Sequence, residues 1–193
     1  MVTRKDGSGA AFATRLLVGV NVPRSKEMSI RPEPDLPDAA RAVGALLAPV
    51  VACLRGDDEG VRLLLDDTCE SGAASDAVRA APAIVRVYLR LAPPPDRADE
   101  IVREFPDAAI ERFGDPELVA VGVECLHVAR VPEPVENIAR AVFVDDAMTH
   151  GDRHALHSAI ASCWWCALNS ARLRDVDPIA EAAAICRYVA RVA

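Results

Sequence analysis

Residues 147–173 read AMTHGDRHALHSAIASCWWCALNSARL, and this stretch decides the fold that we expect. It holds three of the four histidines, both tryptophans and two of the six cysteines. Gly151-Asp152 is a typical helix start, because the Asp152 carboxylate can cap the free amides of the first turn. No Gly or Pro follows before Arg174, so we predict one long helix over 152–174.

At about 100° per residue, this predicted helix has two unlike sides. One arc carries small or branched side chains that let a neighbouring helix approach closely, namely Leu156, Ala159, Ile160, Cys163, Cys166, Ala167, Ser170 and Ala171. The opposite side carries mostly polar groups, namely His154, Ser158, Trp165, Asn169 and Arg172. We therefore expect the two cysteines to point inward and Trp165 to face outward.

The composition favours an all-α fold. Hydrophobic residues make up 51% of the 193 residues, but aromatic residues only 4%. A core built from Ala, Val, Leu and Ile suits closely packed helices better than a sheet sandwich. We predict an irregular bundle of about seven to nine helices around the central helix 152–174.

Apolar spacing and helix start signals place the other helices. The segment 75–92 also alternates like a strand, but the chain offers no convincing partner strand, so we predict a helix there. Prolines are expected to kink or split the first helix at Pro49 and to end the fourth at Pro106. The predicted helices cover about 36–54, 57–69, 75–92, 96–105, 115–130, 135–143 and 177–189.

The chain divides into two parts. Residues 1–35 are expected to be a flexible N-terminal extension with a Pro-rich linker, and residues 36–193 a single helical domain. Residues 1–27 either form an upstream extension without a packed role, or a tail that docks on the domain. The sequence leaves both alternatives open.

Charge and hydropathy exclude several function classes. The net charge is −7 and no basic patch occurs, which argues against nucleic acid as a partner. No uncharged apolar stretch is long enough for a membrane span, and no cleavable signal follows the apolar run 10–22. Scattered cysteines are typical of free thiols in a reducing cytoplasm, which is the location we expect. The Ala-, Arg- and Pro-rich usage indicates GC-rich codons and a bacterial origin.

The first candidate site is Cys163-Trp164-Trp165-Cys166. Two cysteines at this spacing can form a disulfide and exchange it with substrates, if one thiol has a lowered pKa. Such pairs usually stand at a helix N-terminus, whereas Cys163 and Cys166 lie about three turns inside the predicted helix. They are equally consistent with buried cysteines that act as small hydrophobic residues.

The CxxC stretch resembles the helix of the all-helical alkylhydroperoxidase D and carboxymuconolactone decarboxylase family, over about residues 158–185. The resemblance implies a cytosolic thiol redox enzyme that uses Cys163 and Cys166. Two features of that family are missing here. Its histidine after the second cysteine would fall near Ser170, and its upstream glutamate near Gly151 or Asp152.

The second candidate is a metal site of His150, His154 and His157, with Asp146 or Asp152 nearby. His154 and His157 are one turn apart and can share an ion. A zinc ion needs three or four ligands, and His127 can supply one from another helix. The alternative is that these are half-exposed histidines at a helix start.

The third candidate is a protein-binding surface at Trp165 and Arg172. An outward tryptophan among polar groups is a typical anchor for a partner protein. Another helix or the N-terminal segment can equally cover it. The acidic pairs 57–58, 66–67 and 145–146 can bind a hard cation, but none has the spacing of a calcium loop, so solvated helix ends are the simpler interpretation.

No complete catalytic set is present in the sequence. Our leading hypothesis is therefore a non-catalytic cytoplasmic interaction or self-associating domain, with no cofactor, no nucleic acid and no membrane. The alternatives are a thiol-disulfide enzyme at Cys163 and Cys166, and a metal-binding protein at the histidine cluster.

Overall fold

The structure, a computed structural model, describes residues 36–91, 95–130, 146–147 and 149–192. These residues form no strand, which confirms the all-α prediction. The tail 1–35 and the helix predicted around 135–143 lie outside the described residues. The described helices are α2 (Leu36–Leu54), α3 (Asp58–Glu70), α4 (Ala74–Leu91), α5 (Pro95–Phe113), α6 (Pro116–Arg130), α8 (Asp152–Arg174) and α9 (Pro178–Val192).

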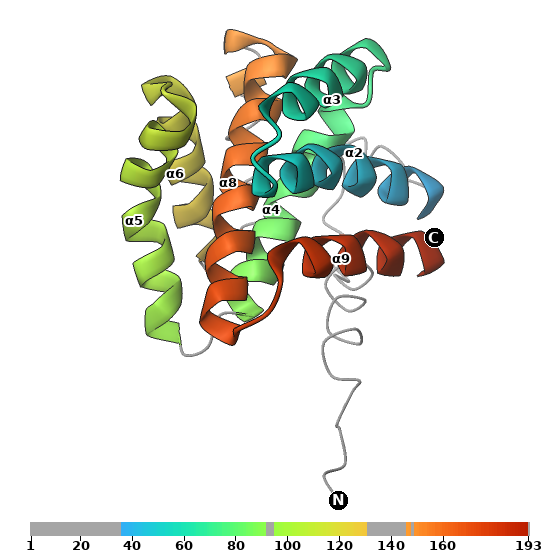
Figure 1. The fold of residues 1–193 in the computed structure, drawn as a ribbon. Coiled ribbons are helices and arrows are strands. Elements are labelled where there is room, and N and C mark those ends of the chain that lie inside the picture. The colour runs from blue at the N-terminus through green and yellow to red at the C-terminus, as the bar shows by residue number, and fades with distance from the viewer. Residues whose placement is uncertain (1–35, 92–94, 131–145, 148, 193) are drawn as a thin grey trace, which may run out of the picture.

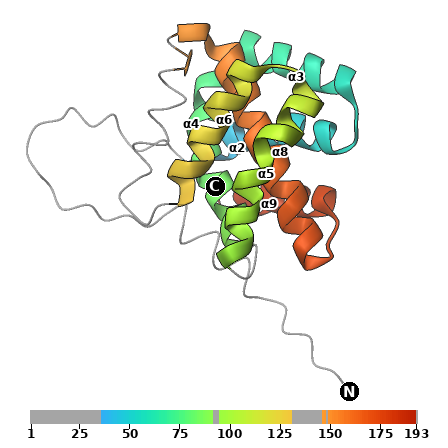
Figure 2. The ribbon, with the colours of Figure 1, turned by 90° about the vertical axis from the view of Figure 1, so that its left-hand side faces the viewer.

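The helices pack as an irregular bundle. α2 and α9 lie side by side and cross the direction of α8, while α5 and α6 run alongside it (Figure 1). In the turned view, α5 and α6 stand in front of α8 (Figure 2). α8 packs against each of the other six described helices. None of the described helices is long and apolar enough to cross a membrane.

α8 begins and ends as the sequence predicts, but its cap differs. Gly151 is the N-cap, with a φ of 92° that favours glycine, and no side chain bonds the first amides. The prediction that Asp152 caps the helix is therefore wrong, because Asp152 is already its first helical residue. At the other end, Asp175 has a left-handed conformation with φ 55° and closes the helix.

The side of α8 expected to face outward is largely buried. Ser158, Trp165 and Asn169 are all buried, and only Arg172 of that side is exposed. Two of these polar groups are satisfied inside the helix: Ser158 Oγ donates to the His154 carbonyl at 3.2 Å, and Asn169 Nδ2 to the Trp165 carbonyl at 3.0 Å. Burying polar side chains that are already hydrogen-bonded costs little free energy. Neighbouring helices can therefore cover both sides of α8.

Two prolines do not interrupt their helices. α2 runs through Pro49 and α5 through Pro106. Of the two alternatives at Pro49, a kink or a split, the split is therefore wrong, and so is the stop predicted at Pro106. A proline removes one backbone hydrogen bond, but the apolar face continues beyond it. Val50 and Ala109 are fully buried after the respective prolines, and this packing holds the helices across them.

The start of α6 is fixed by its cap. Asp115 Oδ1 accepts hydrogen bonds from the amides of Glu117 at 3.0 Å and Leu118 at 3.2 Å. Gly114, with φ 69°, turns the chain out of α5 just before this cap. As a result, two acidic residues, Asp115 and Glu117, stand at the end of the bundle where α8 also begins.

Candidate metal centre

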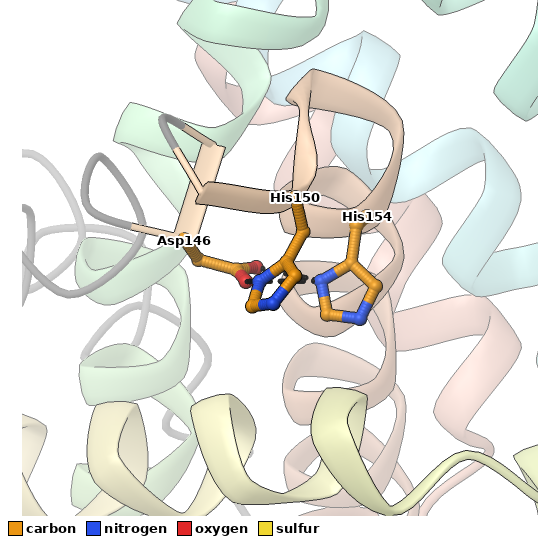
Figure 3. Close-up of side chains that lie close together, drawn as sticks. All are labelled: Asp146, His150 and His154. Carbon is orange, nitrogen blue, oxygen red and sulfur yellow. Dashed lines mark hydrogen bonds and ion pairs between the residues drawn. The ribbon is translucent and has the colours of Figure 1, made fainter.

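A short helical segment before α8 brings an aspartate and two histidines together. Residues 146–147 and 149–150 are helical, so Asp146 and His150 are one turn apart. Gly151 ends this turn, donating its amide to the Ala147 carbonyl at 2.9 Å, and α8 then begins. His154 lies in the first turn of α8 and faces back toward Asp146 (Figure 3).

The Asp146 carboxylate lies within hydrogen-bond distance of both imidazoles. Its Oδ1 is 2.8 Å from Nδ1 of His150 and 3.0 Å from Nδ1 of His154, and its Oδ2 is also 3.0 Å from the latter. The ring centroids of the two histidines are 4.9 Å apart. One ligand atom from each of the three residues lies within 4.8 Å of the others, so the three residues are close enough to share a metal ion.

Burial increases across the cluster. The exposed fraction of the side chain is 38% for His150, 18% for His154 and 1% for Asp146. A buried carboxylate is unfavourable unless hydrogen bonds or cations surround it. Ser158 Oγ adds only a long contact of 3.5 Å to Asp146 Oδ2, so the two imidazoles are its main partners.

The outer edges of the imidazoles face two acidic residues at the start of α6, the cap residue Asp115 and Glu117. His150 Nε2 is 3.8 Å from Glu117 Oε2, and His154 Nε2 is 3.9 Å from Asp115 Oδ2. His154 Nε2 is buried and has no hydrogen-bond partner among the described residues. Asp115 and Glu117 could not be predicted as neighbours of the histidines, because their helix-start pattern gives no sign of which other helix start they meet.

His157, predicted as a third ligand, is not part of the cluster. Its ring packs edge-on against Phe113, with 5.3 Å between centroids, and burial lowers its pKa. Asp152 and His127 are exposed and also lie outside the cluster. The structure thus brings together Asp146, His150 and His154 of the predicted set.

The CxxC pair is buried in an unbroken helix. Cys163 and Cys166 are fully buried, and burial raises the pKa of each thiol well above its ordinary value. A catalytic thiol needs the opposite, namely a lowered pKa and access to substrate. α8 is continuous around both cysteines, so no break in the helix exposes the thiols.

Trp165 is buried, so the expectation that it faces outward is wrong. Only 9% of the residue is exposed, and its indole Nε1 donates to the Ile101 carbonyl at 2.6 Å. The indole is amphipathic, and α5 covers its ring while accepting its N–H. Arg172 remains exposed at the end of α8.

Two of the acidic pairs act as helix caps and ion-pair partners. Asp57 caps α3 by accepting from the Gly60 amide at 2.8 Å, and Asp58 pairs with Arg112. Asp66 pairs with Arg62 at 3.3 Å. These contacts support the interpretation of the two pairs as helix ends.

Comparison of the chain with protein-family models, with curated proteins and with solved structures finds no match. The burial of both thiols opposes the redox chemistry that the resemblance of the CxxC stretch implies.

Proposed function

We propose that the protein binds a divalent transition-metal ion, of which zinc is the best example, through the imidazoles of His150 and His154 with Asp146 as their carboxylate partner. The observation that carries this proposal is the convergence of one buried carboxylate and two imidazoles within 4.8 Å. This is the second alternative from the sequence, with His157 removed from its ligand set.

The donor chemistry selects the class of ion. Calcium and magnesium prefer all-oxygen sites, whereas imidazole nitrogen suits zinc, copper, iron and nickel. Two histidines with carboxylates form a common ligand set for zinc and for non-haem iron. The donor atoms of Asp146, His150 and His154 all lie within 4.8 Å of one another, so small side-chain movements would bring them to the spacing of roughly 3–3.6 Å at which donors bind one zinc ion.

The two other hypotheses have less support. The redox alternative needs reactive thiols, and Cys163 and Cys166 are buried with raised pKa values. The interaction hypothesis loses the predicted anchor Trp165, which is covered, while Arg172 of the same predicted surface is exposed. We also infer that α8 organises the bundle, which is supported by its packing against every other described helix and by the two histidines at and before its start.

The test is metal binding by the full chain after treatment with a chelator. Isothermal titration with Zn²⁺ should give one site per chain, and His154→Ala should abolish it. His127→Ala is the matched control, because His127 is exposed on α6 outside the cluster. At a free zinc concentration of 100 times the Kd, the free energy of unfolding should rise by about 2.7 kcal/mol. A wild-type chain that binds no Zn²⁺, Co²⁺ or Fe²⁺ would overturn the proposal.

A further inference from the structure

The chain folds back sharply just before α8. Asp146 contacts His154 at 3.0 Å and lies 3.5 Å from Ser158 Oγ, although eight and twelve residues separate these pairs. In a continuous helix, twelve residues rise about 18 Å, which is beyond the reach of the two side chains. The helical residues 146–147 and 149–150, which we call the leading turn, therefore do not continue the axis of α8 but bend back toward its first turns (Figure 3).

This bend depends on Gly151. Its φ of 92° and ψ of 160° lie in a region of backbone conformation that only glycine adopts readily. A Cβ at this position would meet no atom within 4 Å, so the backbone conformation, and not a lack of space, requires glycine here. A side chain at position 151 would therefore oppose the bend without touching the cluster.

The three candidate ligands stand on both sides of the bend. Asp146 and His150 belong to the leading turn, whereas His154 belongs to the first turn of α8. Their convergence within 4.8 Å requires the leading turn to be folded back. If the bend opens, His154 moves away from Asp146 and an ion keeps at most two of the three ligands, while zinc sites in proteins use three or four. An ion therefore binds the folded-back arrangement more tightly than the open one and shifts the equilibrium toward it.

Apolar packing fastens the leading turn only in part. Thr149 and His150 are exposed and Ala147 is half-buried, so the turn removes little apolar surface from water. It instead buries the Asp146 carboxylate, whose side chain is 1% exposed. Burying a charge costs free energy unless hydrogen bonds or an opposite charge compensate for it. A divalent ion beside Asp146 supplies such a charge at the place where the turn meets α8.

Resting on the proposed function, we propose that the ion acts as a clasp, which fastens the leading turn onto α8 when it binds and releases the turn when it leaves. Metal binding and the closing of the bend at Gly151 are then coupled, and each favours the other by the same free energy. A change that disfavours the bend weakens the metal affinity even when all three ligands remain. The leading turn is thereby the moving part of a metal-responsive conformational switch.

The first test alters the bend and keeps every ligand. Gly151→Ala places a side chain on a residue with φ 92°, and titration of the full chain with Zn²⁺ should show an affinity about 5–100-fold weaker. Gly56→Ala is the matched control, because Gly56 also has a positive φ, of 72°, and open space for a Cβ, but follows α2 outside the cluster. It should leave the affinity unchanged. Wild-type zinc affinity in a folded Gly151→Ala variant would overturn the inference.

A second measurement uses the unaltered chain and follows hydrogen exchange of the Gly151 amide, which bonds the Ala147 carbonyl at 2.9 Å. At a free zinc concentration about 100 times the Kd, this exchange should slow about 100-fold, because opening of the bend then requires release of the ion. The Gly56 amide, bonded to the Cys53 carbonyl at 3.1 Å, is the control and should slow much less, because its local opening leaves the ion bound.

The outcomes separate this inference from the proposed function. The same response of both glycine amides to bound zinc, whether both slow or neither does, would overturn the clasp and leave the metal site standing. A wild-type chain that binds no Zn²⁺, Co²⁺ or Fe²⁺ would remove both.

Discussion

The indole Nε1 of Trp165 donates a hydrogen bond of 2.6 Å to the main-chain carbonyl of Ile101. This contact joins the middle of α8 to α5, and both residues are buried. A residue that a helical wheel places on the polar side is therefore part of the core. Its polar atom is what makes that burial possible, because the N–H finds an acceptor on the covering helix.

Trp165→Phe should lower the free energy of unfolding by about 2–4 kcal/mol, because it removes a buried hydrogen bond and leaves a small cavity. Urea denaturation followed by circular dichroism measures this. Trp164→Phe is the matched control: Trp164 is buried to the same extent and packs edge-on against Phe113, so the change removes the same ring area without touching the bond to Ile101. Equal losses in the two variants would show that the hydrogen bond to Ile101 contributes nothing specific.

Thiol labelling should separate the cysteines by burial. Under native conditions we expect the partly exposed Cys69 and Cys186 to react first with a thiol reagent, while Cys163 and Cys166 stay protected. Burial raises the pKa of the latter pair, so the reactive thiolate is scarce as well as inaccessible. Mass spectrometry of labelled peptides gives the order, and all six should react in denaturant. Rapid native labelling of Cys163 would contradict the buried arrangement.

The burial of His157 should make the protein less stable in mild acid. Burial lowers its pKa below the ordinary value of 6.5, so the unfolded chain binds this proton more readily than the folded chain does. The free energy of unfolding should therefore fall as the pH drops below about 6.5, and His157→Phe should reduce that slope by up to about 1.4 kcal/mol per pH unit. Denaturation curves between pH 5 and 7, recorded with chelator, test this; an unchanged slope would refute it.

Gly122 is expected to tolerate no side chain. A Cβ at this position would lie 2.6 Å from Phe105 and 3.0 Å from Ser162 Oγ, so Gly122→Ala should destabilise the fold by about 1–3 kcal/mol. Gly44→Ala is the control, because a Cβ there meets no atom within 4 Å. In the interior of α2 that change should stabilise the protein by roughly 0.5–1 kcal/mol. A lower melting temperature for Gly122→Ala and a higher one for Gly44→Ala would support the packing of α6 against α5 and α8.

The sequence predicted the helices better than the faces they bury. Apolar spacing and start signals placed α2 and α8 within their observed bounds, because these are local properties of the chain. The burial of Trp165 was not predictable from a helical wheel, since it depends on a carbonyl contributed by α5. The helix end predicted at Pro106 was wrong for the same reason. The helix continues there because Ala109 packs in the core, and a local sequence pattern does not reveal that packing.

Only part of the candidate site could be predicted from the sequence. Asp146, His150 and His154 lie within nine residues, so their proximity follows from helix geometry. His157 fits the same spacing but turns toward Phe113, and Asp115 and Glu117 approach from a helix start more than thirty residues earlier. Only the packing of α6 beside α8 brings those acids to the histidines.

Ser158, Ser162 and Asn169 donate their hydrogen bonds to carbonyls of α8 itself. None of these three bonds therefore fixes the axial position of a surrounding helix. Contacts that do reach other helices are the indole hydrogen bond to Ile101 of α5, the ion pairs of Arg153 with Asp66 and of Arg174 with Glu181, and the steric fit at Gly122 of α6. A larger side chain at Gly122 would therefore push α6 away from Phe105 and Ser162, and would carry Glu117 with it relative to the imidazole of His150.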